Sequence, residues 1–313
     1  MKRFAQAMFR RLRRSVASSS ARSGAAVTPV KPPSRTVDEG FENFPVERLD
    51  QLVHALRISG KLAQLTPKQA HTILYALHAA GRFDYYADPS TITFNDDGLI
   101  AIHKDTSFLA EPRFQVAYAA GRATGSWREL EPRWRAYVFC WAAERALKLE
   151  GDFVECGVNR GGNALAAMHY LNFQSVPKRF YLLDTFCGFP ESQRADAASC
   201  NHDRYADCYA EVVQTFRPYP NAVIVRGAIP GTLNQVPAEK VAFLSIDMNC
   251  AEPEIAAAEY FWDRLVSGAA IVLDDYACGK WYVRQKEAFD AFAKARGVRV
   301  LALPTGQGLI FKP

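Results

Sequence analysis

A glycine-rich stretch, residues 151–163, constrains the fold of this chain more than any other segment. It reads Gly-Asp-Phe-Val-Glu-Cys-Gly-Val-Asn-Arg-Gly-Gly-Asn: a short apolar strand ends at Glu155, a tight turn follows, and Asn163 opens an apolar helix ending near Leu171. The glycines of the turn are Gly157, Gly161 and Gly162. Glycine permits sharp turns and close approach of a ligand, and a helix N-terminus offers unpaired N–H groups. The stretch therefore predicts a strand–loop–helix unit with a ligand site at its turn.

The next predicted strand, Arg179 to Asp184, ends in a carboxylate. An acid at the tip of the second strand of such a unit can accept hydrogen bonds from ribose hydroxyls, which predicts an adenosine-type cofactor. The glycine spacing differs from G-x-G-x-x-G, so it disfavours a dinucleotide, and Glu-x-Gly-x-x-x-Gly-Gly fits S-adenosylmethionine better. Gly227 follows a later strand where an adenine ring could lie. Because α/β domains without a nucleotide also carry glycine turns, the motif alone leaves a purely structural role open.

Charge is unevenly distributed along the 313 residues, of which 49% are hydrophobic. Residues 1–37 contain nine Lys and Arg and no acid, whereas the remainder contains 29 basic and 33 acidic residues. A mildly acidic body excludes a protein that binds nucleic acid through its main domain. Since no apolar run approaches the ~20 residues of a membrane span, we expect no transmembrane segment.

The seven cysteines form no C-x-x-C pair and no zinc-like pattern with histidine. An odd number of cysteines without a disulfide framework is typical of a reducing compartment. We therefore expect a soluble, cytoplasmic protein.

The composition of residues 1–37, rich in Arg and Ser and then in Pro, is typical of a disordered tail. Apolar residues between the arginines, such as Phe4 and Leu12, leave weak contact with an anionic membrane or an organellar transit role as alternatives. We divide the remainder into a helical and hairpin region, 38–150, which contributes to an acceptor pocket, and a cofactor-binding catalytic domain, 151–313.

Helical periodicity and turn signals predict the elements before residue 150. They are two helices within 46–86, a β-hairpin at 91–102 with an Asp-Gly turn, and helices at 113–121 and 132–149. The last helix carries an aromatic stripe, in which Trp134 and Tyr137 either pack in the core or contact a ligand.

Strands alternate with helices from residue 151 onward, which predicts an α/β fold of the Rossmann-like type: a doubly wound sheet of seven strands with the last one antiparallel. The later elements are strands at 222–226, 241–246, 269–273, 298–303 and 309–312, and helices at 205–216, 250–265 and 283–296. Ligands of such sheets bind beyond the carboxyl ends of the strands. Acidic residues fall at these ends: Glu155, Asp184, Asp247, Asp274 and Asp275.

Three of these carboxylates, Asp247, Asp274 and Asp275, would repel one another in one cleft unless a positive group compensates. A hard divalent cation such as Mg²⁺ takes oxygen ligands and is the natural partner. The alternative is that Asp274 or Asp275 caps a turn. Agreement of all three positions favours the metal site.

Four motifs together carry a family resemblance. They are Glu-Cys-Gly-Val-x-x-Gly-Gly (155–162), Asp-Thr-Phe-x-Gly-Phe-Pro (184–190), Ile-Asp (246–247) and Val-Leu-Asp-Asp-Tyr (272–276). This set resembles the TylF/MycF-type macrocin O-methyltransferases over roughly residues 105–313. The resemblance implies a class I, S-adenosylmethionine-dependent and Mg²⁺-requiring enzyme that methylates a sugar hydroxyl.

The resemblance also implies roles for individual residues. Those expected to bind the cofactor are Glu155, Gly157 and Gly161 at its methionine end, Asp184 with Thr185 at its ribose, and Gly227. Asp247, Asp274 and Asp275 are expected to hold Mg²⁺. The family often has Asp-Gly-Asp where this chain has Asp247-Met-Asn249. An amide cannot act as a carboxylate base, so Asp247 is the expected proton acceptor.

Other functions share parts of this pattern. An NAD(P)-dependent sugar-modifying oxidoreductase would use the same sheet, but the chain lacks the G-x-G-x-x-G fingerprint of a dinucleotide site. A non-catalytic methyltransferase homologue that binds a partner is another alternative. The intact Asp247, Asp274 and Asp275 speak against it, whereas Asn249 leaves it open. A metal-dependent methyltransferase of catechols would share every site residue. We expect a homo-oligomer whose acceptor is a sugar or glycoside.

Overall fold

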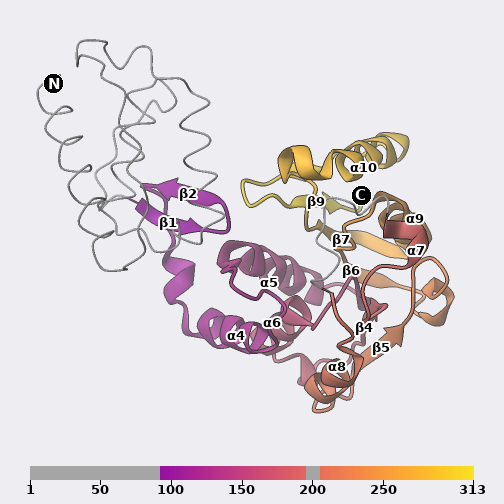
Figure 1. Ribbon diagram of the computed structural model, residues 1–313, viewed down its shortest axis with the longest axis horizontal. Coiled ribbons are helices and arrows are strands. Elements are labelled where there is room, and N and C mark those ends of the chain that lie inside the picture. The colour runs from indigo at the N-terminus through magenta and orange to yellow at the C-terminus, as the bar shows by residue number, and fades with distance from the viewer. Residues whose placement is uncertain (1–91, 195–204) are drawn as a thin grey trace, which may run out of the picture. The chain divides into compact units, whose positions relative to one another are not determined.

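The computed structural model of the protein describes residues 92–194 and 205–313. A sheet of seven strands forms the centre of this part of the chain (Figure 1). The strands are β3 (Asp152–Cys156), β4 (Phe180–Asp184), β5 (Ala222–Arg226), β6 (Val241–Ile246), β7 (Leu265–Leu273), β8 (Leu301–Ala302) and β9 (Gly308–Phe311). Their spatial order is β5-β4-β3-β6-β7-β9-β8. The strands β3 to β7 pair in parallel, and β9 runs antiparallel to β7 and β8, which confirms the predicted topology.

Helices cover both faces of the sheet (Figure 1). The α-helices are α4 (Pro112–Ala123), α5 (Arg133–Leu147), α6 (Gly162–Leu171), α7 (Glu191–Arg194), α8 (Tyr209–Phe216), α9 (Ala251–Trp262) and α10 (Val283–Ala295). Short 3₁₀ helices are η5 (Ser107–Ala110), η6 (Phe173–Ser175), η8 (Leu233–Gln235) and η9 (Gly279–Tyr282). None of the described helices is both long enough and apolar enough to cross a membrane.

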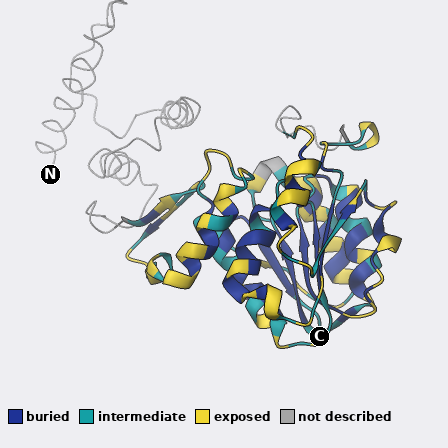
Figure 2. Cartoon of the chain, turned by 90° about the horizontal axis from the view of Figure 1, so that it is seen from below, coloured by how far each residue is buried: buried dark blue, intermediate teal, exposed yellow. Residues whose placement is uncertain are grey.

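Alternating side chains of the strands build two separate cores. Phe153 and Phe243 face α4, α5, α6 and α8, whereas Val154 and Leu244 face α9 and α10. Both faces of the inner strands are therefore buried, as expected for parallel strands with helices on both sides, and Figure 2 shows them in dark blue between partly exposed helices. Because α4 and α5 pack in the same core as α6, they extend the sheet domain on its N-terminal side.

The hairpin predicted before residue 102 is present as β1 (Ile92–Asp96) paired with β2 (Leu99–Ile102). Asp97 and Gly98 form its two-residue turn with φ values of 50° and 77°. Positive φ at both turn positions is what a tight hairpin requires and explains the Asp-Gly sequence. The predicted tail at 1–37 and the helices predicted within 46–86 lie outside the described residues.

Four predicted elements differ from the observed ones by more than two residues. The helix expected from Tyr205 begins at Tyr209, because the N–H of Cys208 bonds to the carbonyl of Phe186. The strand expected from Ala269 begins at Leu265, since Gly268 (φ 81°) introduces an irregularity that breaks the alternation seen in sequence. The helix before it therefore ends at Trp262. The strand expected at 298–303 is reduced to Leu301–Ala302, an exposed edge pairing only with β9.

Candidate active site

A pocket opens at the carboxyl edge of the sheet, where β3, β4, β5 and β6 end. Six of the predicted site residues line it: Glu155, Gly157, Asp184, Thr185, Gly227 and Asp247. The pocket is closed on other sides by Ser126, Trp127 and Tyr205. The turn between β3 and α6, residues 157–162, forms one wall, and we call it the glycine loop.

The glycines of this loop serve two different purposes. Gly157 adopts φ 91° and lies so close to the backbone carbonyl of Asp247 that a Cβ would overlap it. Gly161 adopts φ 85°, caps the N-terminus of α6 and packs against the ring of Phe216. Gly157 therefore permits close packing of the glycine loop against the backbone of Asp247. Gly161 starts the helix and does not line the pocket, so its contact with the cofactor stays a prediction.

Asp184 fixes the conformation of the glycine loop. Its Oδ2 accepts hydrogen bonds from the backbone N–H groups of Val158 and Asn159, at 2.8 and 2.7 Å. Its Oδ1 accepts from the N–H of Phe186 at 2.7 Å. Thr185 beside it donates its hydroxyl to the carbonyl of Gly188 at 2.5 Å. The carboxylate thus ties the end of β4 to the loop after β3, and contact of Asp184 and Thr185 with ribose remains a prediction.

Glu155 is a buried acid at the floor of the pocket. Only 1% of the residue is exposed, and its Oε2 has no hydrogen-bond partner among residues 92–194 and 205–313. Burial raises its pKa well above the usual value, and the nearby charges of Asp274 and Asp184 raise it further. A buried carboxylate without a partner is costly, so a donor group on a ligand would satisfy it.

Beside this pocket the predicted acidic residues converge into one cluster. Oxygen atoms of Asp247, Asp274 and Asp275 all lie within 4.8 Å of one another, and we call this set the acidic centre. Burial, followed by repulsion from Asp274 and Asp275, raises the pKa of Asp247 well above its ordinary value. Burial and the charge of Asp274 raise the pKa of Asp275 to about 6. The carboxylates therefore require a positive partner, as the sequence predicted.

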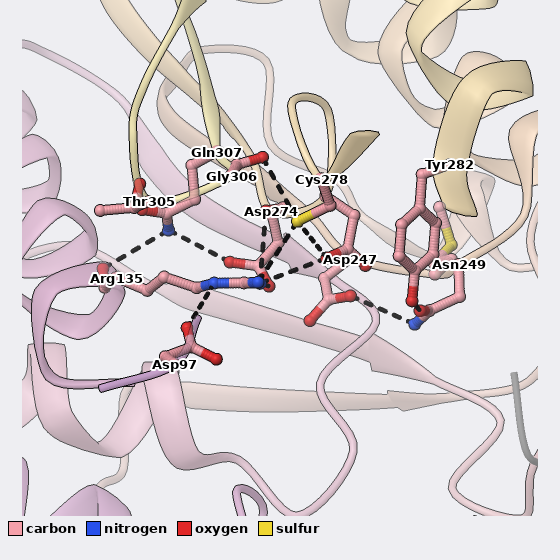
Figure 3. A network of polar contacts seen from close by, with 12 residues as sticks. Asp97, Arg135, Asp247, Asn249, Asp274, Cys278, Tyr282, Thr305, Gly306 and Gln307 are labelled. Atoms are coloured by element: carbon pink, nitrogen blue, oxygen red, sulfur yellow. Dashed lines mark hydrogen bonds and ion pairs between the residues drawn. The ribbon is translucent and has the colours of Figure 1, made fainter. Parts of the chain in front are cut away.

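One positive partner is a residue of the protein itself. Arg135, in the first turn of α5, places Nη1 2.8 Å from Asp274 Oδ2 and 3.2 Å from Asp275 Oδ1 (Figure 3). Its Nε lies 2.9 Å from Asp97 Oδ2, in the turn of the hairpin. The sequence did not indicate a role for Arg135, because this residue lies among the aromatic residues of its helix. It did not indicate one for Asp97 either, because an Asp-Gly pair is already explained by the hairpin turn.

A second group of side chains holds Asp247. Asn249, with φ 55°, donates from Nδ2 to Asp247 Oδ1 at 3.3 Å. Tyr282 at the end of η9 donates its hydroxyl to Asn249 Oδ1 at 2.8 Å (Figure 3). The tyrosine therefore fixes which way the amide points, and the amide donates to the carboxylate. No sequence signal identified Tyr282.

The aromatic residues predicted to pack in the core or contact a ligand turn out to pack against the hairpin side. Trp134 meets the ring of Phe94 edge-on at 5.0 Å between ring centroids, and Tyr137 stacks on Phe108 at 4.2 Å. Neither lines the pocket, whereas Trp127 and Tyr205 do. The helical periodicity of the stripe thus reflects packing.

The chain was compared with known proteins. A model of the macrocin O-methyltransferase (TylF) family matches residues 135–301, more than half of the chain. The 8-demethyl-8-(2,3-dimethoxy-alpha-L-rhamnosyl)-tetracenomycin-C 4'-O-methyltransferase of Streptomyces olivaceus is 27% identical over 151 residues. That match covers 44% of this chain and 58% of the relative, less than two thirds of its length.

The fold also resembles a solved structure. The O-methyltransferase NovP superposes with a TM-score of 0.54 at 19% identity, covering 66% of this chain and 99% of NovP. This likeness concerns the fold alone and confirms the predicted Rossmann-like methyltransferase sheet. The family model, which spans the glycine loop and the acidic centre, shows that the chain belongs to the macrocin O-methyltransferase (TylF) family.

Proposed function

We propose that the protein is an S-adenosylmethionine-dependent, Mg²⁺-requiring O-methyltransferase that methylates a hydroxyl group of a sugar, in a glycan or a glycosylated natural product. The observation that carries this proposal is the position of Asp247. This residue lines the pocket beside the glycine loop, and its carboxylate belongs to the acidic centre. A cofactor in the pocket and an acceptor at the acidic centre would therefore meet at this residue. Family membership and the sugar methyltransferase from Streptomyces olivaceus support the same reaction.

The residues of the pocket suit a cofactor that carries both a positive charge and polar groups. The unpaired, buried Glu155 can accept from an ammonium group, which the methionine end of S-adenosylmethionine would supply. The glycine loop, held by Asp184, permits close approach of a ligand to the backbone. S-adenosylmethionine, when bound, provides the electrophilic methyl group.

The acidic centre suits a hard divalent cation. Three carboxylates with oxygens within 4.8 Å supply the oxygen donors that Mg²⁺ prefers, and waters or acceptor oxygens complete its coordination. Mg²⁺, when bound, supplies electrostatic stabilisation of a developing alkoxide. Asp274 is oriented for such a site, because Gln307 donates to its Oδ1 at 3.1 Å.

Asp247 is the group that we expect to accept the proton of the acceptor hydroxyl. The amide of Asn249 occupies Oδ1, which leaves Oδ2 for that proton. The deprotonated oxygen would then bond to the methyl group as the bond from that group to the sulfonium sulfur breaks, which would leave S-adenosylhomocysteine. The fixed positions of the pocket and the acidic centre would supply the alignment.

The proposal also includes a cytoplasmic location. The cysteines in the described part of the chain are free thiols, as expected in a reducing compartment.

The experiment is a turnover assay with S-adenosylmethionine, Mg²⁺ and a panel of rhamnosides and other glycosides, read out by mass spectrometry of the acceptor. We expect one acceptor to gain a methyl group, and we expect EDTA to stop the reaction and excess Mg²⁺ to restore it. Methyl transfer that continues undiminished in EDTA would contradict the metal requirement. Methylation of catechols with no glycoside accepted would contradict the sugar specificity.

A further inference from the structure

The guanidinium of Arg135 contacts the acidic centre in a way that bears on how this centre takes up a cation. Nη1 lies between two carboxylates, 2.8 Å from Asp274 Oδ2 and 3.2 Å from Asp275 Oδ1. Only 19% of the arginine side chain is exposed, so water screens these contacts weakly. Two of the three oxygens expected to bind a divalent cation therefore already have a positive partner.

Gln307 and Cys278 also contact both Arg135 and the carboxylates of the acidic centre. Gln307, which is buried, donates from Nε2 both to Asp274 Oδ1 at 3.1 Å and to the carbonyl of Arg135 at 3.4 Å (Figure 3). Cys278 Sγ lies 3.3 Å from Arg135 Nη2 and 3.4 Å from Asp275 Oδ1. These contacts fix Arg135 and the carboxylates relative to one another.

The other side of the guanidinium faces a carboxylate from the hairpin. Asp97 Oδ2 lies 2.9 Å from Arg135 Nε, and 15% of the Asp97 side chain is exposed. Asp97 precedes the residues that the family model matches, 135–301. Three carboxylates, those of Asp97, Asp274 and Asp275, thus contact a single guanidinium. Asp247 lies beside two of them, so the site is negative enough to attract a further cation.

We propose that Arg135 is the built-in counter-ion of the acidic centre. It holds Asp274 and Asp275 together when no divalent cation is bound, and it competes with that cation for their oxygens. Asp97 binds the opposite edge of the guanidinium and thereby limits this competition. Arg135 and Asp97 are positioning residues, since both act through the carboxylates. The inference rests on the metal site of the proposed function.

The two residues have effects of opposite sign on cation affinity. Arg135→Gln removes a positive charge next to the site, so Mg²⁺ should bind more tightly. Asp97→Asn removes a negative charge and leaves the guanidinium to Asp274 and Asp275, so Mg²⁺ should bind more weakly. A scaffolding role alone predicts weaker binding in both variants, because either change would loosen the carboxylates.

A matched control is available in the same two elements. Arg133, two residues before Arg135 on α5, pairs with Asp96, the neighbour of Asp97. Within residues 92–194 and 205–313, no hydrogen bond or ion pair joins Arg133 or Asp96 to the acidic centre. Arg133→Gln removes the same charge from the same helix turn and breaks the same kind of hairpin contact. Its effect measures the general influence of charge and of hairpin attachment.

The experiment is calorimetric titration of the full chain with Mg²⁺, without S-adenosylmethionine or acceptor, together with thermal unfolding with and without Mg²⁺. We expect the Kd for Mg²⁺ to fall at least about fivefold in Arg135→Gln, to rise about two- to threefold in Asp97→Asn, and to change less than about twofold in Arg133→Gln, given the strength of a charge at this distance in a partly buried site. Without Mg²⁺, Arg135→Gln should have a lower Tm than the wild type and gain more from added Mg²⁺.

Other outcomes would overturn the proposal. They are unchanged or weaker binding in folded Arg135→Gln, or unchanged or tighter binding in Asp97→Asn. Arg135→Lys keeps the charge, so its affinity should stay near that of the wild type. Should Arg135→Gln fail to fold, Asp97→Asn and Arg135→Lys decide the question. Failure of every variant and of the wild type to bind Mg²⁺ would also overturn it, whereas the methyltransferase proposal is tested separately by S-adenosylmethionine binding.

Discussion

The glycine loop and the acidic centre lie side by side at the carboxyl edge of the sheet, but they are built in different ways. The glycine loop is shaped by its backbone conformation and by the hydrogen bonds that the N–H groups of Val158 and Asn159 donate to Asp184 at the end of the adjacent strand. The acidic centre consists of carboxylates from the ends of two strands, and side chains of distant segments, Arg135 and Gln307, hold it in place. A short motif can therefore specify the first, whereas the second depends on the folded arrangement and on charge balance.

The two regions touch at one point, where Gly157 lies against the backbone carbonyl of Asp247. Gly157→Ala should have the largest effect, because it adds strain of about 1–3 kcal/mol from the positive φ and forces the added methyl group into that carbonyl. We expect a marked loss of Tm and of S-adenosylmethionine binding. Gly297→Ala is the control, since Gly297 has φ 68° but open space around it. Equal stability of the two variants would show that the contact does not matter.

Asp275→Asn should separate the regions by damaging only the acidic centre. We expect methyl transfer to fall at least about 1,000-fold, corresponding to about 4 kcal/mol of transition-state stabilisation, while the affinity for S-adenosylmethionine changes little. Removal of one of three repelling charges should not lower the Tm. Asp263→Asn, a change of an exposed aspartate, is the control for both measurements. Retention of turnover by Asp275→Asn would refute the metal role.

The pH dependence of stability should arise from the acid-rich side. Glu254 on α9 is buried and accepts from the N–H of Met248 at 3.1 Å. Burial and then the charge of Asp275 raise its pKa to about 8. A folded-state pKa above the unfolded one means that stability is fully present below about pH 4.5 and is lost as pH rises toward 8.

Glu254→Gln should therefore remove part of this loss. We expect the variant to unfold like the wild type near pH 4.5 and to be more stable at pH 8 by on the order of 2 kcal/mol, with metal-free protein in both cases. Chemical denaturation across that range measures the difference. Glu252→Gln, at an exposed position two residues earlier on the same helix, should leave the slope unchanged. A parallel pH profile for wild type and Glu254→Gln would contradict the raised pKa.

The smallest effect is expected at the link between Tyr282 and Asp247. Tyr282→Phe removes the hydrogen bond that orients Asn249, and we expect kcat to fall about three- to tenfold, in line with one hydrogen bond. The affinity for S-adenosylmethionine should stay unchanged. Tyr219→Phe, which removes a hydrogen bond to His169 on the far side of the domain, provides the control. An unchanged kcat in Tyr282→Phe would show that the amide needs no support.

The contrast between the regions also explains what the sequence could reveal. The sheet and the convergence of Asp247, Asp274 and Asp275 followed from strand periodicity, because the carboxyl ends of parallel strands share one edge. Arg135 and Asp97 are separated by 38 positions in the sequence. One lies in a helix and the other in a hairpin turn, and the structural role of each segment explains its sequence without any function. Only the folded chain brings them to the carboxylates.

The predicted boundaries of helices and strands were wrong where pairing with a distant strand outweighed the local sequence pattern. Leu265 joins β7 because it pairs with Val241, although Gly268 interrupts the strand pattern after it. Trp134 and Tyr137 could have faced a ligand on helical spacing alone. The rings that pack against them, Phe94 of the hairpin and Phe108 of η5, lie in earlier segments of the chain.

Calorimetric titration of the purified protein with S-adenosylmethionine, and separately with NAD⁺, tests the central claim most directly. The account predicts micromolar binding of S-adenosylmethionine that persists in EDTA, because the pocket beside the glycine loop is separate from the carboxylates of Asp274 and Asp275. Glu155→Gln should weaken the binding of S-adenosylmethionine, since an amide has no negative charge to pair with the ammonium group of the cofactor. Absence of S-adenosylmethionine binding under every condition, with an NAD⁺ signal in its place, would contradict the methyltransferase and favour an oxidoreductase.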